Sequence, residues 1–242
     1  MAEWFAKLKA DFILNFIEQG RWKQLINGLG ITLEVTFFAL IIGVFIGVLV
    51  SIIRSTYDKN YKTAPKSIVK AIMTILNGIC KFYLTIIRGT PVVVQLLIGY
   101  FIIFASSTNS VMVASLIFGI NSGAYVTEIF RSGIMSIDNG QFEAGRSLGF
   151  NYAQTMWYVI VPQAFKNVLP TLCNEFIVLL KETAVCGYVG LVDLTKAGEQ
   201  IRNRTYSAFM PLFAVALIYL AMVIILTWLV GKLERKLRNN ER

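Results

Sequence analysis

The sequence predicts an all-helical integral membrane protein with five membrane-spanning helices, and two observations carry that prediction. Among 242 residues, 56% are hydrophobic and 15% are charged, whereas an ordinary globular domain carries about 25% charged residues. No charged residue lies between Gly89 and Thr127, or between Thr205 and Gly231. Both runs exceed the roughly 20 apolar residues that cross a bilayer, so membrane spans explain them better than a buried soluble core.

The N-terminal residues 1–24 are expected to form an amphipathic helix at the membrane interface. Phe5, Leu8, Phe12 and Phe16 recur at helical spacing, and charged residues occupy other positions around the helix. A cleavable signal would need an unbroken apolar block, which is not present here. Packing of this helix against the membrane-spanning helices is the alternative.

A membrane domain is expected over residues 25–231, with a charged tail at residues 232–242. Its spans are predicted at residues 28–53, 68–105, 111–134, 163–182 and 208–230. The second stretch is too long for one straight crossing, because about 38 helical residues reach about 57 Å against a hydrocarbon core of about 30 Å. Gly89-Thr90-Pro91 is the expected break, since proline removes a backbone donor and clashes with the preceding turn.

Basic residues predict how the chain is oriented in the membrane. With five spans, one side collects Arg54, Lys59, Lys62, Lys66, Lys70, Arg131, Arg146, Lys166, Lys232, Arg235, Lys236, Arg238 and Arg242. The other side holds the smaller group Lys7, Lys9, Arg21, Lys23, Lys181, Lys196, Arg202 and Arg204. Because Lys and Arg concentrate in cytoplasmic loops, we expect the N-terminus outside and the C-terminus in the cytoplasm.

The residue inventory argues against an enzyme. Histidine, the commonest metal ligand and general base near neutral pH, is absent. The cysteines Cys80, Cys173 and Cys186 lack CxxC spacing and stand in apolar surroundings. No nucleophile–base constellation and no Gly-x4-Gly-Lys-Ser/Thr nucleotide loop is present. We therefore expect no catalytic residue, no metal site and no cofactor bound by this chain.

A polar insert at about residues 136–161 separates the third span from the fourth. Asn139-Gly140 is a turn signal, and the residues after it can form about two helical turns. Gly149 suits a left-handed helix stop. Asn151 followed by Gln154 is typical of a capping box that opens a second helix.

This insert is expected to project from the membrane and to bind a soluble partner. Ala144 and Gly145 are small enough for close approach, while Glu143 and Arg146 can make charged contacts at the rim. An ordinary amphipathic loop between two spans is the alternative. The expected docking residues are Glu143, Ala144, Gly145, Arg146, Leu148 and Gly149.

Polar residues within the apolar regions are candidates for a second site. A charge at the centre of a membrane helix costs roughly 2.5–3.5 kcal/mol, so such residues usually face the interior of a bundle and mark function. The alternative is internal pairing, for example of Glu128 with Arg131 at i, i+3, or contact of Lys181 and Glu182 with lipid headgroups. The candidates are Arg88, Gln95, Glu128, Asn174, Glu175, Lys181, Glu182 and Thr183.

The insert resembles the Glu-Ala-Ala-x3-Gly-x9-Ile-x-Leu-Pro loop of ATP-binding-cassette (ABC) importer permeases. Gly145 stands for the second Ala, Val159 for Ile and Val161 for Leu. Four further segments resemble the polar amino acid branch, of the histidine, glutamine and arginine type. This sequence departs from the pattern of that branch at two positions, with Glu182 in place of Asp and Ala184 in place of Ser. The four segments are Arg88–Pro91, Ala124–Arg131, Pro162–Ala164 with Leu169-Pro170, and Leu179–Ala184.

The resemblance implies a type I importer permease fold with the insert as a cytoplasmic coupling helix. It implies a bacterial inner-membrane complex with ABC ATPase subunits, a second permease subunit, identical or related, and an extracytoplasmic amino-acid-binding protein. ATP and Mg²⁺ would act on the ATPase, and the intramembrane residues would line a path for a polar amino acid. No nucleic acid partner is implied.

Two other classes of function fit the sequence less well. An ion-driven secondary transporter is expected to show inverted repeats, and no internal repeat is visible in this sequence. A non-transporting membrane scaffold would account for the insert at Glu143, but it would leave Arg88, Glu128 and Glu175 without a role.

Overall fold

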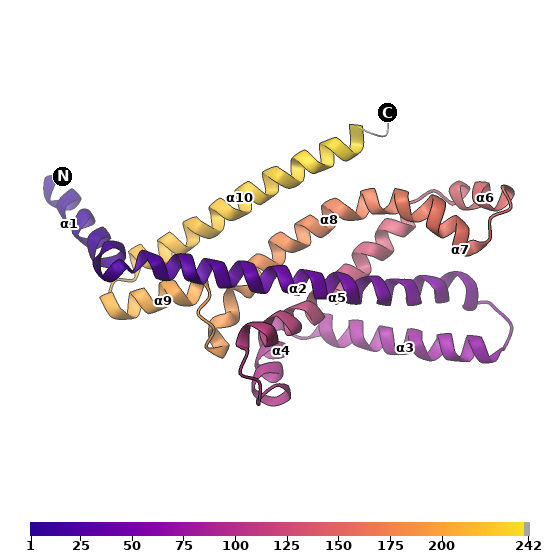
Figure 1. Ribbon diagram of the computed structural model, residues 1–242, viewed down its shortest axis with the longest axis horizontal. Coiled ribbons are helices and arrows are strands. Elements are labelled where there is room, and N and C mark those ends of the chain that lie inside the picture. Colours follow the sequence, from indigo (N-terminus) through magenta and orange to yellow (C-terminus); the bar gives the residue numbers. More distant parts are fainter. Residues whose placement is uncertain (240–242) are drawn as a thin grey trace. The chain divides into compact units, whose positions relative to one another are not determined.

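The computed structural model describes residues 1–239, and the part of the predicted tail at residues 240–242 lies outside them. Within the described residues the chain is helical almost throughout and contains no strand, as predicted (Figure 1). The α-helices are α1 (Ala2–Phe12), α2 (Trp22–Thr56), α3 (Ile68–Gly89), α4 (Val92–Ile98), α5 (Ser110–Met135), α6 (Asn139–Ser147), α7 (Tyr152–Thr155), α8 (Val161–Glu182), α9 (Leu194–Thr205) and α10 (Phe209–Asn239). The π or 3-10 segments are η1 (Ile13–Ile17), η2 (Glu18–Gly20), η3 (Tyr57–Tyr61), η4 (Gly99–Ile103), η5 (Met156–Ile160) and η6 (Thr183–Val189).

Four helical segments of the described chain are long and apolar enough to cross a membrane. They are Trp22–Tyr61, Ile68–Gly89, Ser110–Met135 and Phe209–Leu237. The remaining predicted span, at residues 163–182, corresponds to α8, whose 22 residues rise about 33 Å. It has the length of a span but a more polar composition, which suits a helix that faces other helices more than lipid.

The predicted break in the second apolar stretch is confirmed. Helix α3 ends at Gly89, Thr90 is extended, and α4 begins at Val92, directly after Pro91. Pro162 behaves differently, because the chain stays helical from the π segment η5 into α8. It follows directly on this π-helical turn, in which the Val161 N–H bonds to the Met156 carbonyl five residues earlier, so the bond that proline cannot make falls where one helical form changes to the other.

The chain forms two compact units. The first contains residues 1–39, 92–118 and 177–228, and the second contains residues 40–91, 119–176 and the chain from 229 onward. Long helices contribute a segment to each unit, and each unit has an apolar core of its own.

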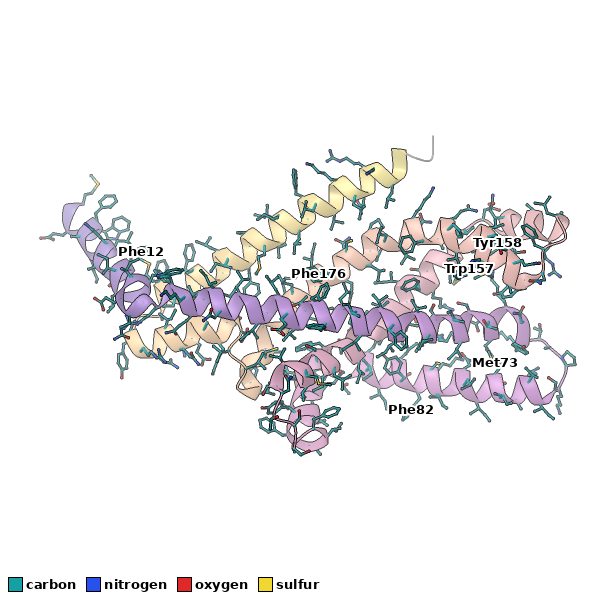
Figure 2. The ribbon with its side chains drawn as sticks, viewed as in Figure 1. Phe12, Met73, Phe82, Trp157, Tyr158 and Phe176 are labelled. Atoms are coloured by element: carbon teal, nitrogen blue, oxygen red, sulfur yellow. The ribbon has the colours of Figure 1, made fainter. Side chains whose placement is uncertain are left out.

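In the first unit, the N-terminal segment packs against α9. Phe16 is 8% exposed and joins a core with Leu25, Leu194, Ile201 and Val215. Phe5 and Phe12 remain exposed, and Figure 2 shows Phe12 on the outer part of this segment. One end of the amphipathic segment is therefore fixed to the bundle, while its other apolar side chains are free to meet lipid.

Helix α9 lies between the predicted spans at residues 163–182 and 208–230, in a segment for which no helix was predicted. Its N-cap is Asp193, a fully buried residue whose carboxylate accepts hydrogen bonds from the backbone N–H groups of Thr195 (3.1 Å) and Lys196 (3.2 Å). Thr32 of α2 accepts a further bond from the Leu194 N–H at 3.1 Å. A Cβ atom added to Gly28 would lie 2.7 Å from the Asp193 carbonyl oxygen, so α2 approaches this cap closely.

In the second unit, glycines allow α2 and α5 to pack at close range. A Cβ atom at Gly43 would lie 3.0 Å from Ser122, and one at Gly47 would lie 2.5 Å from Val126. From the other side, a Cβ atom at Gly123 would lie 2.9 Å from Ile46. Small residues serve this purpose in membrane helices because they bring two backbones together.

We predict that Gly47→Ala lowers the thermal midpoint of the detergent-solubilised protein. The new methyl group must displace Val126 and approach the Thr127 backbone N at 3.0 Å, and overpacking of this kind costs about 1–3 kcal/mol. The matched control is Gly78→Ala in α3, where a Cβ atom meets nothing within 4 Å. That change should leave stability unchanged or raise it by up to about 1 kcal/mol. Equal midpoints for the two variants would contradict the close contact.

We also predict that Asp193→Ala destabilises the protein by about 1 kcal/mol, because it removes the cap of α9, whereas Asp193→Asn keeps the cap. Burial raises the pKa of the Asp193 carboxyl above its ordinary value. The folded state therefore holds this proton more tightly than the unfolded chain, and the carboxyl favours folding less as pH rises above that ordinary value. Asp193→Asn should lose this pH dependence in thermal unfolding. A pH profile of the variant equal to that of the wild type would refute a raised pKa of Asp193 in the folded state.

Candidate functional site

The polar insert folds as two short helices held by local hydrogen bonds. Asp138 caps α6 by accepting a bond from the Gly140 N–H, and Gly149 follows α6 at φ +84°. Asn151 and Gln154 form a reciprocal capping box at the start of α7, with both bonds at 2.9 Å. The predicted left-handed stop and capping box are both confirmed. Helices α6 and α7 contact each other, and Figure 1 shows them as a compact pair beside the start of α8.

Gly145 does not face outward, contrary to what the sequence suggested. It is buried, and an added Cβ atom would lie 2.6 Å from Thr155 of α7. Its small size therefore lets the two helices of the insert approach each other. This is an inner contact, whereas an outer contact with a partner was expected of Gly145. Glu143, Ala144 and Arg146 are exposed, and Leu148 is 75% exposed.

The insert also contacts η3, the segment that follows α2. The Lys59 ammonium, in η3, lies 3.1 Å from the centroid of the Phe142 ring in α6. Next to this contact is an open cavity of about 400 Å³. Its walls come from η3 and from both insert helices, and they are Lys59, Asn60, Asn139, Phe142, Glu143, Arg146, Tyr152 and Thr155.

Two exposed aromatic residues lie in η5, the segment between α7 and α8. Trp157 is 70% exposed and Tyr158 is 66% exposed, and Figure 2 shows them together on this segment. In membrane proteins, such residues favour the boundary between lipid and water.

The central feature of the second unit is a carboxylate shared by three guanidinium groups. Glu128 of α5 accepts a hydrogen bond from Nη1 of Arg54 at 3.1 Å, and the same oxygen lies 3.9 Å from Nη1 of Arg88. Its other oxygen lies 3.5 Å from Nε of Arg131. Arg131 in turn pairs with Asp58 at 3.2 Å. The predicted pairing of Glu128 with Arg131 is thus confirmed, but it is one of three.

An open pocket of about 530 Å³ lies beside this cluster. Its walls are Arg54, Lys81, Leu84, Thr85, Arg88, Gly89 and Glu128. Three cations and one carboxylate line it, so the pocket has an excess of positive charge and attracts anionic groups. The Arg88 guanidinium carbon also lies 5.6 Å from the centroid of the Tyr125 ring, within range of a cation–π contact.

Glu175 in α8 has a partner of a different kind. Its carboxylate accepts a hydrogen bond from the buried hydroxyl of Ser122 in α5 at 2.8 Å. Neighbouring Asn174 is exposed. Among the described residues, no cationic side chain forms an ion pair with the Glu175 carboxylate.

The other candidates belong to the first unit. Thr183 is buried, and its hydroxyl lies 3.4 Å from that of Thr36. Lys181 is exposed, while Gln95 and Glu182 are partly buried. Of the eight residues expected in the membrane site, the structure joins Arg88 and Glu128 directly.

Comparison with known proteins identifies the family. The model of the family described as binding-protein-dependent transport system inner membrane components matches residues 64–239. The chain belongs to this family. It is therefore a membrane permease subunit of an ABC-type, binding-protein-dependent transport system, and the family decides against the ion-driven transporter and the scaffold.

Individual relatives agree with this assignment. The permease is 36% identical over 232 residues to the arginine transport system permease protein ArtQ of Bacillus subtilis (strain 168), covering 90% of this chain and 94% of the relative. It is 34% identical to the glutamine transport system permease protein GlnP of Escherichia coli (strain K12), covering 68% and 77%.

Solved structures show the same fold. The crystal structure of an amino acid ABC transporter with histidines superposes with a TM-score of 0.79 at 38% identity, covering 91% of the permease and 98% of that chain. The inward-facing MetNI methionine ABC transporter gives a TM-score of 0.74 at 21% identity, covering the same shares of the two chains. The second comparison supports the fold alone.

Several residues of the contact network in the second unit were not predicted from the sequence as part of it. Arg54 and Lys59 were expected only as orientation signals, and Asp58 was not among the candidates. The available signal was simple, because any charge inside or at the end of a predicted span needs a partner or water.

We predict that Glu128→Gln lowers the thermal midpoint of the permease by an amount equivalent to about 1–2 kcal/mol. The change leaves Arg54, whose side chain is 15% exposed, without its carboxylate, and an uncompensated cation of this kind is costly. The half-exposed position of Glu128 keeps the effect below that of a fully buried pair. Glu234→Gln, at an exposed carboxylate of α10, is the control and should have no effect. A Glu128 variant as stable as this control would argue against the cluster.

Proposed function

We propose that the permease forms half of a translocation path for a polar amino acid in an ATP-driven importer. The observation that carries this proposal is the Glu128 carboxylate shared by Arg54, Arg88 and Arg131 beside an open pocket. Charged groups of both signs inside a membrane domain are expensive, and a zwitterionic substrate gives them a use. The named transport of arginine and of glutamine by relatives supports the same class.

The two ends of an amino acid need opposite partners. Arg88, Gln95 and Lys181 would donate hydrogen bonds to its carboxylate, and Glu128, Glu175 and Glu182 would accept from its ammonium group. Asn174 and Thr183 would add neutral contacts along the path. Because Glu128 is already shared among guanidinium groups, the pocket beside it suits the carboxylate end of the substrate better than the ammonium end.

The insert is proposed as the docking element for a separate ABC ATPase, which would bind ATP and Mg²⁺. The exposed residues Glu143, Ala144, Arg146 and Leu148 would contact the ATPase. Gly145 and Gly149 would maintain the shape of the insert. Closure of the ATPase subunits would then move the insert and rock the packed helices between two access states.

The remaining partners follow from the same proposal. A few spans enclose little space, so the path would lie between this permease and a second permease subunit, identical or related. An extracytoplasmic binding protein would deliver the amino acid. We place the complex in the bacterial inner membrane, with residues 1–24 at the outer face, residues 25–231 as the membrane domain, and the tail from residue 232 in the cytoplasm.

The test is to reconstitute the permease with its ATPase and binding protein and to measure ATP hydrolysis with a panel of amino acids. We expect one or a few polar amino acids to stimulate hydrolysis. Glu143→Lys should reduce the stimulation about tenfold, because a repulsive charge at an interface costs several kcal/mol. Glu234→Lys, a charge reversal on α10 outside the insert, is the control and should respond like the wild type.

Two outcomes would count against the proposal. A complex that assembles but responds to no polar amino acid would refute the substrate class. Full stimulation of the Glu143→Lys complex would refute the docking role of the insert.

A further inference from the structure

A chain of contacts runs through the second unit, from the insert to the intramembrane cluster, with one link made by the backbone. It begins at Phe142 of α6, which contacts Lys59 of η3. Asp58, which precedes Lys59 in the backbone of η3, pairs with Arg131 of α5 at 3.2 Å. Arg131 contacts Glu128, which holds Arg54 and Arg88.

We infer that Asp58 and Lys59 are positioning residues that transmit movement of the insert to the Glu128 cluster. This inference rests on the proposed function and deepens it, because it names the residues that connect ATPase docking to the path. Neither residue needs to touch substrate or ATPase. Their role is to make the position of the insert and the arrangement of the guanidinium groups depend on each other.

The geometry at η3 supports such a link. Lys59 and Asp58 are neighbours in a five-residue π-helical segment, and they reach two different elements, α6 and α5. A shift of the insert that moves Phe142 therefore acts on the same turn that holds Arg131. The cavity of about 400 Å³ between η3 and the insert leaves room for the two to change their separation.

The electrostatics of the cluster provide the second half of the link. Arg131 is shared between Asp58 and Glu128. If Asp58 moves away, Glu128 is the acidic partner that remains for Arg131 among the described residues, and Arg131 competes there with Arg54 and Arg88. Glu128 and Arg88 line the pocket of about 530 Å³, so a change at η3 alters the charge presented to a substrate. Packed networks with two discrete arrangements carry coupling of this kind between distant sites.

The test uses the complete complex of permease, ATPase and binding protein in proteoliposomes. Two quantities are measured: the stimulation of ATP hydrolysis by amino-acid-loaded binding protein, and the number of amino acids imported per ATP hydrolysed. Basal hydrolysis and complex assembly are measured in parallel, because a purely structural role would change those instead. We expect Lys59→Gln and Asp58→Asn each to lower stimulation about three- to tenfold, with assembly and basal hydrolysis retained.

Conservative changes distinguish transmission from general disturbance. Lys59→Arg keeps a cation over the Phe142 ring and Asp58→Glu keeps the ion pair, so both should restore most of the stimulation. Lys62→Gln, at an exposed lysine of the same loop outside the chain of contacts, should behave like the wild type. In the double variant Asp58→Asn with Phe142→Leu, the loss should not exceed that of the stronger single variant, because both changes interrupt one path.

The outcomes separate the inference from the function on which it rests. If the wild-type complex shows no response to any amino acid, the proposed function fails and the inference fails with it. If the wild type responds and Lys59→Gln and Asp58→Asn respond equally well, only the inference is overturned. Losses that multiply in the double variant, or that follow a loss of assembled complex, would also overturn it.

Discussion

Hydrocarbon offers no hydrogen-bond partner, and this constraint shapes the whole molecule. A polar group within it must find a partner inside the protein. Threonines meet the requirement locally, for example Thr32, Thr36 and Thr127, whose hydroxyls donate to the carbonyl four residues earlier at 2.7–3.0 Å. A charge can pair within one turn of helix, as Glu128 does with Arg131 of α5, but Glu128 also draws side chains from α2 and α3.

Close approach between helices follows from the same constraint. In lipid, apolar side chains gain little by meeting each other, so association depends on contact and on interhelical hydrogen bonds. Glycines at 43, 47 and 123 bring α2 and α5 together, and the Glu128 network lies along the same pair of helices. Contact between backbones and pairing of charges thus stabilise one interface. The insert is attached to this rigid pair through η3 and α5, which is why it is well placed to act on the cluster.

The sequence was sufficient where the physical signal is local. Pro91, Gly149 and the Asn151–Gln154 pair each set the conformation of a few neighbouring residues, and all three expectations are confirmed. It failed where the partner is distant, since Arg54 and Glu128 are 74 positions apart. Gly145 shows a second limit of prediction from sequence, because a small residue can allow close contact with a partner protein or within its own chain. The fold shows that Gly145 packs against Thr155 of the same insert. Helix α9 was missed because its apolar positions, Leu194, Ala197 and Ile201, stand among charged residues that suggest a loop.

The capping box, the glycine stop and the contact of Gly145 with Thr155 all lie inside the insert. Its shape therefore depends mainly on its own residues, with Lys59 and the Gln141–Gln163 bond as examples of ties to the rest of the chain. An element of this kind behaves as an adaptor. Its outward side chains can change in evolution to bind a different ATPase subunit while the membrane helices keep their sequence. The choice of ATPase and the choice of transported substrate can therefore evolve separately.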